Sequence, residues 1–203
     1  MRPLTVAIIA VAGFSPFHLS VPFIVFSEKM AEKKRFHVII CAEKPGNVDS
    51  ADGFSVTATH DYTAVIQADI VIITYWGTIT QKPPLKNKRA ATHWEFEREF
   101  QARFPQTHLD INALYVDDDG IITSAGTAAA LDCCLYIVRQ HFGSDYANHI
   151  ARRMVVPPYR TGGQAQFIEQ PVPKNTHDER INLLLDYQRQ NIAQQHELDS
   201  LAQ

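Results

Sequence analysis

The hydrophobic residues of the first half of the chain form three short, continuous runs. Thr5–Ala12, His37–Ala42 and Asp69–Trp76 are rich in β-branched residues, and each is followed by glycine or proline. Runs that are apolar on both faces are typical of strands covered by helices on both sides, as in a parallel sheet. Between the first two runs, Ser15–Arg35 has apolar residues at helical spacing and basic residues at its end, which predicts a helix. The pattern therefore predicts a β-α-β unit.

The second half of the chain combines a hairpin with helices. Its two short apolar runs, Leu114–Val116 and Ile121–Thr123, flank an Asp-Gly pair, which is a hairpin signal. Helical spacing of apolar residues continues in three further stretches, Trp94–Phe104, Thr127–Phe142 and Ser144–Val156. A glycine or a proline follows each stretch and is expected to end the helix.

The last part of the chain changes in composition. Arg160–Pro173 is rich in glycine, glutamine and proline, which is typical of a linker. A helical pattern begins again near Thr176, where Thr176 and Glu179 have the spacing of a capping box. The predicted organisation is a domain over residues 1–160, a linker over 161–175 and the start of a second domain over 176–203.

Composition and charge exclude several classes of protein. The chain has 203 residues, 45% of them hydrophobic and 20% charged, which is ordinary for one globular domain. Its net charge of −3 does not suit a domain that holds DNA by charge, although Lys82, Lys86, Lys88 and Arg89 form a local basic cluster. No apolar run approaches the ~18 residues of a membrane span. Three cysteines with one adjacent pair do not make a disulfide framework, so a cytoplasmic protein is expected.

Few residues suggest catalysis or metal binding. The glycine motifs that hold phosphates and the Cys-x-x-Cys motif are absent from the sequence. His93 and Glu97 lie four residues apart, but structural zinc requires four ligands, so no metal site is predicted. Cys41 and Cys134 fall on buried positions, whereas Cys133 points about 100° away from Cys134 on the helix and is a candidate for exposure.

The carboxyl ends of the predicted strands are the place where open α/β sheets bind ligands. Gly13–His18 and Tyr75–Gly77 lie there, and their aromatic side chains suit a pocket as well as they suit an ordinary core. Ser124–Thr127 follows a strand and precedes a helix. We interpret it as a helix N-terminus open to anions, because no base is paired with it as a nucleophile elbow would require.

Five stretches together resemble a known family. They are Gly13–Phe26, Arg89–Trp94, Leu114–Cys134, Ala151–Pro158 and Gly162–Phe167. They are similar to AraC-family regulators of the GlxA type, in which a ThiJ/PfpI domain, similar to class I glutamine amidotransferases, precedes a double helix-turn-helix. The resemblance implies an α/β fold, a three-layer flavodoxin-like sandwich.

The chain departs from this family in two places. The family has a central strand, a nucleophile elbow and a helix before the stretch that contains His93, whereas here Gly77 reaches that stretch through a short segment. The elbow strand and helix are therefore expected to be absent, and the helix-turn-helix domain that should begin near Thr176 is expected to be truncated. His93 matches the histidine of catalytic relatives and His18 stands at the position of their acid, but no cysteine matches the nucleophile, so catalysis is not expected.

The resemblance implies a ligand-sensing and dimerising domain of a transcriptional regulator, without enzyme activity and without a cofactor. The expected partners are an unidentified small-molecule effector and a second copy of the chain, with the helices Thr127–Phe142 and Ser144–Val156 as candidate contact surfaces. DNA is expected to be bound only through the missing helix-turn-helix, and no membrane is involved. The predicted ligand-binding residues are Phe14, His18, Tyr75, Trp76, His93, Ser124, Gly126 and Thr127.

Two alternatives remain open at this level. One is an enzyme, a ThiJ/PfpI-type hydrolase or a glyoxalase-like protein. The other is a remnant that folds poorly, because the loss of a central strand leaves backbone groups of its neighbours unpaired.

Overall fold

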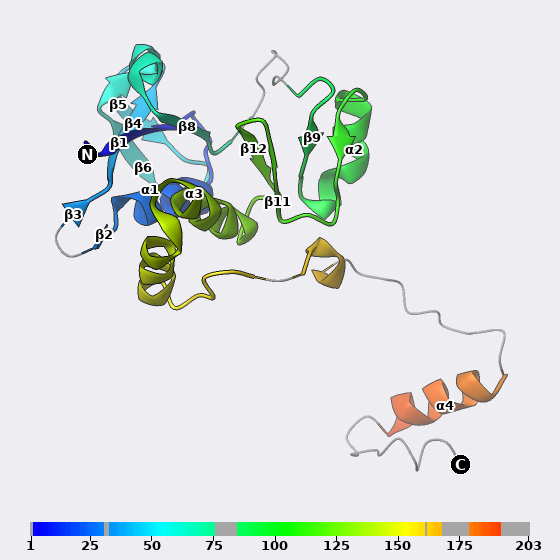
Figure 1. Cartoon of the computed structure of the whole chain (residues 1–203). Coiled ribbons are helices and arrows are strands. Elements are labelled where there is room, and N and C mark those ends of the chain that lie inside the picture. Colours follow the sequence, from blue (N-terminus) through cyan, green and yellow to red (C-terminus); the bar gives the residue numbers. More distant parts are fainter. Residues whose placement is uncertain (1, 31–32, 76–84, 161, 168–178, 192–203) are drawn as a thin grey trace. The chain divides into compact units, whose positions relative to one another are not determined.

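The computed structural model describes residues 2–30, 33–75, 85–160, 162–167 and 179–191 (Figure 1). The chain divides into two compact units, Met1–Phe167 and Ile168–Gln203. The described part of the second unit contains one helix, α4 (Glu179–Gln190). The sheet and the candidate site lie in the first unit. Trp76 and Lys82, which the sequence analysis singled out, lie outside the described residues.

A sheet of four parallel strands forms the centre of the first unit. Across the sheet the order is β7 (His60–Asp61), β4 (Phe36–Ala42), β1 (Leu4–Ile9) and β8 (Ile70–Ile73). Val6 of β1 lies opposite Val38 on one side and Ile70 on the other. The three predicted apolar strands are confirmed, although β1 and β8 end earlier than their apolar runs. Among the described residues no strand pairs beyond β8.

Two helices pack on one face of this sheet, α1 (Pro16–Ser27) and α3 (Ala129–Arg153) (Figure 1). Helix α1 has proline at its start, where a missing N–H costs nothing. The prediction that this helix continues to Arg35 is wrong. Glu28 is extended, and the chain then forms a short antiparallel hairpin of β2 (Lys29–Met30) and β3 (Lys33–Lys34).

The core between the sheet and these helices contains aromatic rings from three elements. Phe36 of β4 packs edge to face against Phe26 of α1 and against Phe142 of α3, with 4.9 Å between ring centroids in each pair. Such contacts stabilise beyond the area that they bury. Phe26 and Phe36 are among the largest fully buried side chains of the described residues.

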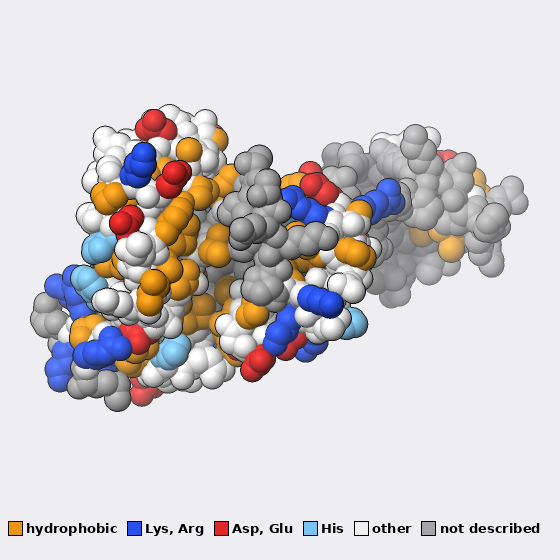
Figure 2. Space-filling model, turned by 90° about the horizontal axis from the view of Figure 1, so that it is seen from above, with side chains coloured by type: hydrophobic (Ala, Val, Ile, Leu, Met, Phe, Trp, Pro, Cys, Tyr) orange, Lys and Arg blue, Asp and Glu red, His pale blue; other side chains and the backbone are white. Residues whose placement is uncertain are grey.

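The opposite face of the sheet has a thinner cover. Ala7, Ile39 and Cys41 form a small buried cluster there with residues around the 3₁₀ helix η1 (Tyr62–Gln67). Figure 2 shows apolar side chains gathered on this side of the molecule. Val71 and Ile73 of β8 are 45% and 46% exposed. The fold is the predicted α/β class, but in the described residues its third layer is reduced to η1.

Helix α3 is interrupted at the predicted position. Gly143 has φ 81° and ψ 174°, which is not helical, so the element consists of two helical halves. Side chains other than glycine rarely adopt this conformation. The prediction that glycine ends the first of two successive helices is confirmed.

The remaining elements are short. The predicted hairpin is confirmed as β11 (Tyr115–Asp118) and β12 (Ile121–Ser124), and the predicted helix after Trp94 consists of η2 (Trp94–Phe96) and α2 (Glu97–Arg103). The more polar hairpin of β5 (Gly46–Asp49) and β6 (Ser55–Ala58) was not predicted. The other short elements are β9 (Arg89–Ala90) with β10 (His108–Leu109), and η3 (Gln164–Phe167).

Candidate functional site

A contact between α1 and the turn after β12 forms the centre of the candidate site. His18 Nε2 accepts a hydrogen bond from the backbone N–H of Thr127 at 2.8 Å. Gly126 lies against the same ring, since a Cβ added there would be 3.5 Å from His18 Nε2. Gly126 and Thr127 both have positive φ values, and the Gly126 N–H donates to Ser124 Oγ at 3.1 Å. Three of the predicted residues therefore lie in one tight turn, and a fourth, His18 of α1, contacts it.

His18 is held in its neutral form. Burial lowers its pKa from the usual 6.5, and electrostatic repulsion between the rings of His18 and His93 lowers this pKa further. A neutral imidazole has one acceptor nitrogen and one N–H, and Nε2 is the acceptor toward Thr127. His18 therefore fixes the turn as a hydrogen-bond acceptor and keeps Nδ1–H as a donor.

His93 lies in the same neighbourhood, at the start of η2. Its Nδ1 accepts a hydrogen bond from the Glu95 N–H at 3.3 Å, which caps this helix. Its ring centroid is 5.4 Å from that of Trp94 and 5.9 Å from that of Phe96. The side chain of His93 is 28% exposed and remains accessible to a small molecule.

Two other predicted residues, Phe14 and Tyr75, lie outside the turn after β12. Phe14 is buried and lines an apolar hollow of about 230 Å³ between α1 and the hairpin of β5 and β6. No other predicted ligand-binding residue lines this hollow. Tyr75 follows β8 and is 43% exposed. Trp76 lies outside the described residues, so its predicted role stays a prediction.

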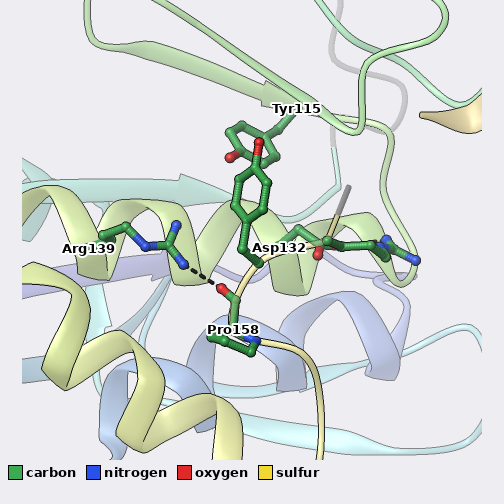
Figure 3. Close-up of a pocket in the computed structure, with 6 residues that line it drawn as sticks. Tyr115, Asp132, Arg139 and Pro158 are labelled. Atoms are coloured by element: carbon green, nitrogen blue, oxygen red, sulfur yellow. Dashed lines mark hydrogen bonds and ion pairs between the residues drawn. The ribbon is translucent and has the colours of Figure 1, made fainter. Parts of the chain in front are cut away.

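A second hollow, shown in Figure 3, is too small for a ligand. Its volume is about 10 Å³, enough for about one water molecule. Arg139 donates a hydrogen bond to the carbonyl of Pro158, and Arg160 pairs with Asp132 at 2.5 Å. These contacts hold the segment after α3 against that helix, which is a structural role.

None of the three cysteines is suited to act as a nucleophile. All three are buried, and the candidate exposure of Cys133 is wrong, because its residue is only 8% exposed. Helix α3 packs against the sheet and also against the hairpin that contains Asp117. These two contacts enclose Cys133. Burial and the charges of Asp117 and Asp132 raise the pKa of Cys133 to about 12. Burial also raises the pKa of Cys41 and of Cys134, so the thiolate needed for attack is disfavoured.

Two described basic residues of the predicted cluster, Lys88 and Arg89, are paired with acids. Lys88 Nζ lies 3.1 Å from Asp119 and 3.7 Å from Asp118, and Arg89 lies 3.5 Å from Asp110. Within the described residues no group of three potential metal ligands occurs, and no helix there is long and apolar enough to cross a membrane.

One residue of the site region was missed by the sequence analysis. Gln164 is 3% exposed, and its side chain binds the backbone on both sides of His93, at Thr92 and Trp94. The composition of its segment indicates a linker, and no periodic pattern marks a buried position there. Only the tertiary structure reveals its place.

The fold defines a class, the flavodoxin-like α/β domains, and is similar to the fold of ThiJ/PfpI proteins. A ThiJ/PfpI family protein from Pseudomonas syringae has a TM-score of 0.61 and 16% identity, over 94% of this chain and 88% of its own. An AraC family transcriptional regulator from Pseudomonas putida has a TM-score of 0.62 and 18% identity, over 75% of this chain and 100% of its own. At such identities the likeness establishes the fold, and the predicted fold class is confirmed.

A similarity in sequence points in the same direction. The HTH-type transcriptional regulator ArgR from Pseudomonas aeruginosa is 32% identical over 84 residues, which are 41% of this chain and 25% of the length of ArgR. The match thus spans a quarter of this curated relative. No protein-family model matches the chain. The predicted resemblance to AraC-family regulators with a ThiJ/PfpI-like domain is confirmed by similarity in structure and in sequence.

Proposed function

We propose that the chain is the sensing domain of an AraC-type transcriptional regulator, which binds a small-molecule effector in the cytoplasm without converting it. The observation that carries this proposal is the contact of His18 with Thr127 beside His93. The turn is held by hydrogen bonds and lies next to the partly exposed imidazole of His93, while the chain has no thiol suited to attack. The similarity to ArgR and to regulators of known structure supports the regulatory role.

The chemistry of the site suggests the class of effector. Neutral His18 has a donor at Nδ1, and His93, whose Nδ1 accepts from Glu95, offers a donor at Nε2. Both groups favour a ligand with oxygen acceptors, such as a carboxylate or an amide. We therefore propose a small polar effector that contacts His18 and His93.

A thermal-shift screen with small carboxylates, amino acids and amides tests this proposal. A ligand at ~100 times its dissociation constant adds about 2.7 kcal/mol to the stability of the folded state, which is readily measured. We expect the shift in the unaltered chain and in a His108→Gln control, whose exposed histidine lies in β10. His18→Gln and His93→Gln should each reduce the shift. A ligand whose effect survives both substitutions would place the site elsewhere.

We assign no DNA contact to the first unit. Lys88 and Arg89 are occupied by aspartates, and the chain as a whole is negatively charged. Phosphate neutralisation requires accessible cations. In this proposal DNA binding belongs to a helix-turn-helix domain of the kind that the resemblance implies.

We further propose that the chain acts as a homodimer through α1 and the neighbouring hollow. Helix α1 contains no charged residue, and its exposed side presents Phe17, Phe23 and Ile24. Phe54, beside the hollow, is also exposed. A side chain of one copy can fill the hollow of the other, which is how self-complementary dimer surfaces exclude water.

A further inference from the structure

Gln164 makes an unusually complete set of hydrogen bonds for a residue in a linker-like segment. Its Nε2 donates to the carbonyls of Thr92 and Ile111, both at 2.8 Å, and of Ala113 at 3.0 Å. Its Oε1 accepts from the N–H of Trp94 at 2.9 Å. One buried amide therefore joins the backbone before and after His93 to the loop that follows β10.

The residues around Gln164 are fitted to the same loop. The Gln164 N–H donates to the carbonyl of Asn112 at 2.8 Å, and the Ala165 N–H donates to Asn112 Oδ1 at 3.0 Å. Gly163 packs so closely that a Cβ there would lie 2.1 Å from Asn112 O. Glycine is required at this position because the backbones approach too closely for any side chain.

We call Gly163, Gln164 and Ala165, together with their partner Asn112, the anchor. The anchor lies at the end of the first unit. The first unit ends at Phe167, directly after η3, and the second unit follows. The anchor is therefore the last described attachment of the chain to the first unit before residue 168. The residue that it brackets, His93, belongs to the candidate site.

We propose that Gln164 is a positioning residue that couples His93 to the end of the first unit. It links the backbone around His93 to the segment through which the chain leaves that unit. A displacement of Thr92–Trp94 breaks bonds of a buried amide, and partial breakage leaves buried groups unpaired. Such a network favours two discrete states, held and released. If the proposed effector binds at His93, which rests on the function proposed above, its binding shifts this equilibrium and alters the hold on residues 163–165.

Coupling of this kind is reciprocal, which allows a test without any ligand. The measurement is amide hydrogen exchange, residue by residue, on the full chain. Gln164→Glu keeps the shape of the side chain but removes the donors toward three carbonyls. We expect exchange at Trp94 to accelerate at least tenfold and the ring resonances of His93 to shift. Gln67→Glu, at an exposed glutamine of η1, makes the same change of charge. It should alter neither the exchange rate at Trp94 nor the ring resonances of His93.

The reverse direction uses His93→Ala, which removes the cap of η2. We expect faster exchange at Ala165, whose acceptor Asn112 is untouched, while His37→Ala on β4 should have no such effect. Should Gln164→Glu fail to fold, Gly163→Ala serves as a second variant, because it displaces the anchor and leaves the amide of Gln164 intact. It should also accelerate amide exchange at Trp94. The proposal would be overturned if Gln164→Glu accelerated amide exchange only around residues 163–165 and His93→Ala accelerated it only around residues 92–94. Because no effector is added, these results stand apart from the search for one.

Discussion

At the scale of single residues, His18 illustrates how burial assigns a role to an ordinary side chain. Its ring is partly buried against Gly126, and its Nε2 is committed to the Thr127 N–H. The positive charge of a protonated His18 would be opposed by burial and by His93. The neutral ring is therefore the form that stabilises the fold.

This assignment predicts a pH dependence of stability. The pKa of His18 is below 6.5 in the folded chain, so the unfolded chain binds its proton more readily. The stabilisation by neutral His18 is complete above about pH 6.5 and is lost as the pH falls toward the lowered pKa. Urea unfolding at about pH 7.5 and about pH 5.5 should show a smaller drop in unfolding free energy for His18→Gln than for the unaltered chain. An equal drop in both would contradict the role of His18.

The cysteines lead to a second prediction at this scale. Since all three are buried with raised pKa values, the native chain should react only slowly with a thiol reagent at neutral pH, and all three should react after unfolding. The same argument predicts no amidase, protease or glyoxalase activity. Rapid labelling of one native thiol would be evidence against it, and so would an activity that Cys133→Ser abolishes.

At the scale of elements, Gly143 determines how α3 is divided. Its φ and ψ values are rarely available to other residues, and a Cβ there would meet no atom within 4 Å. The cost of Gly143→Ala therefore lies in the backbone alone. We expect a loss of about 1–3 kcal/mol in unfolding free energy, measured by denaturant titration. Ser144→Ala, at the next exposed residue, should change stability by less than about 0.5 kcal/mol.

At the scale of the whole molecule, the apolar side of α1 predicts a dimer. Sedimentation at tens of micromolar should show two copies, and Phe23→Glu should give monomers with an unchanged circular dichroism spectrum. Ile66→Glu places the same charge on η1, where Ile66 is 84% exposed, and should leave the dimer intact. Dissociation by Ile66→Glu instead would assign the interface to the thinly covered face of the sheet.

Local patterns in the sequence were sufficient for much of the fold. The apolar runs predicted β1, β4 and β8 because a strand buried on both faces needs no polar alternation. The Asp-Gly pair predicted the hairpin of β11 and β12, and Gly143 predicted the break in α3, because both depend on conformations of neighbouring residues. The hairpin of β5 and β6 escaped prediction, since its short polar strands have no such pattern.

The site required information that no local pattern contains. The similarity of several stretches to known regulators suggested His18, His93 and Ser124–Thr127, but His18 and Thr127 are 109 residues apart, and only the packing of α1 against the turn after β12 joins them. The burial of Cys133 and the anchor at Gln164 likewise depend on which elements meet. Sequence determines what a segment can form by itself, whereas burial, pKa and hydrogen-bond partners depend on distant segments and are decided by the tertiary structure.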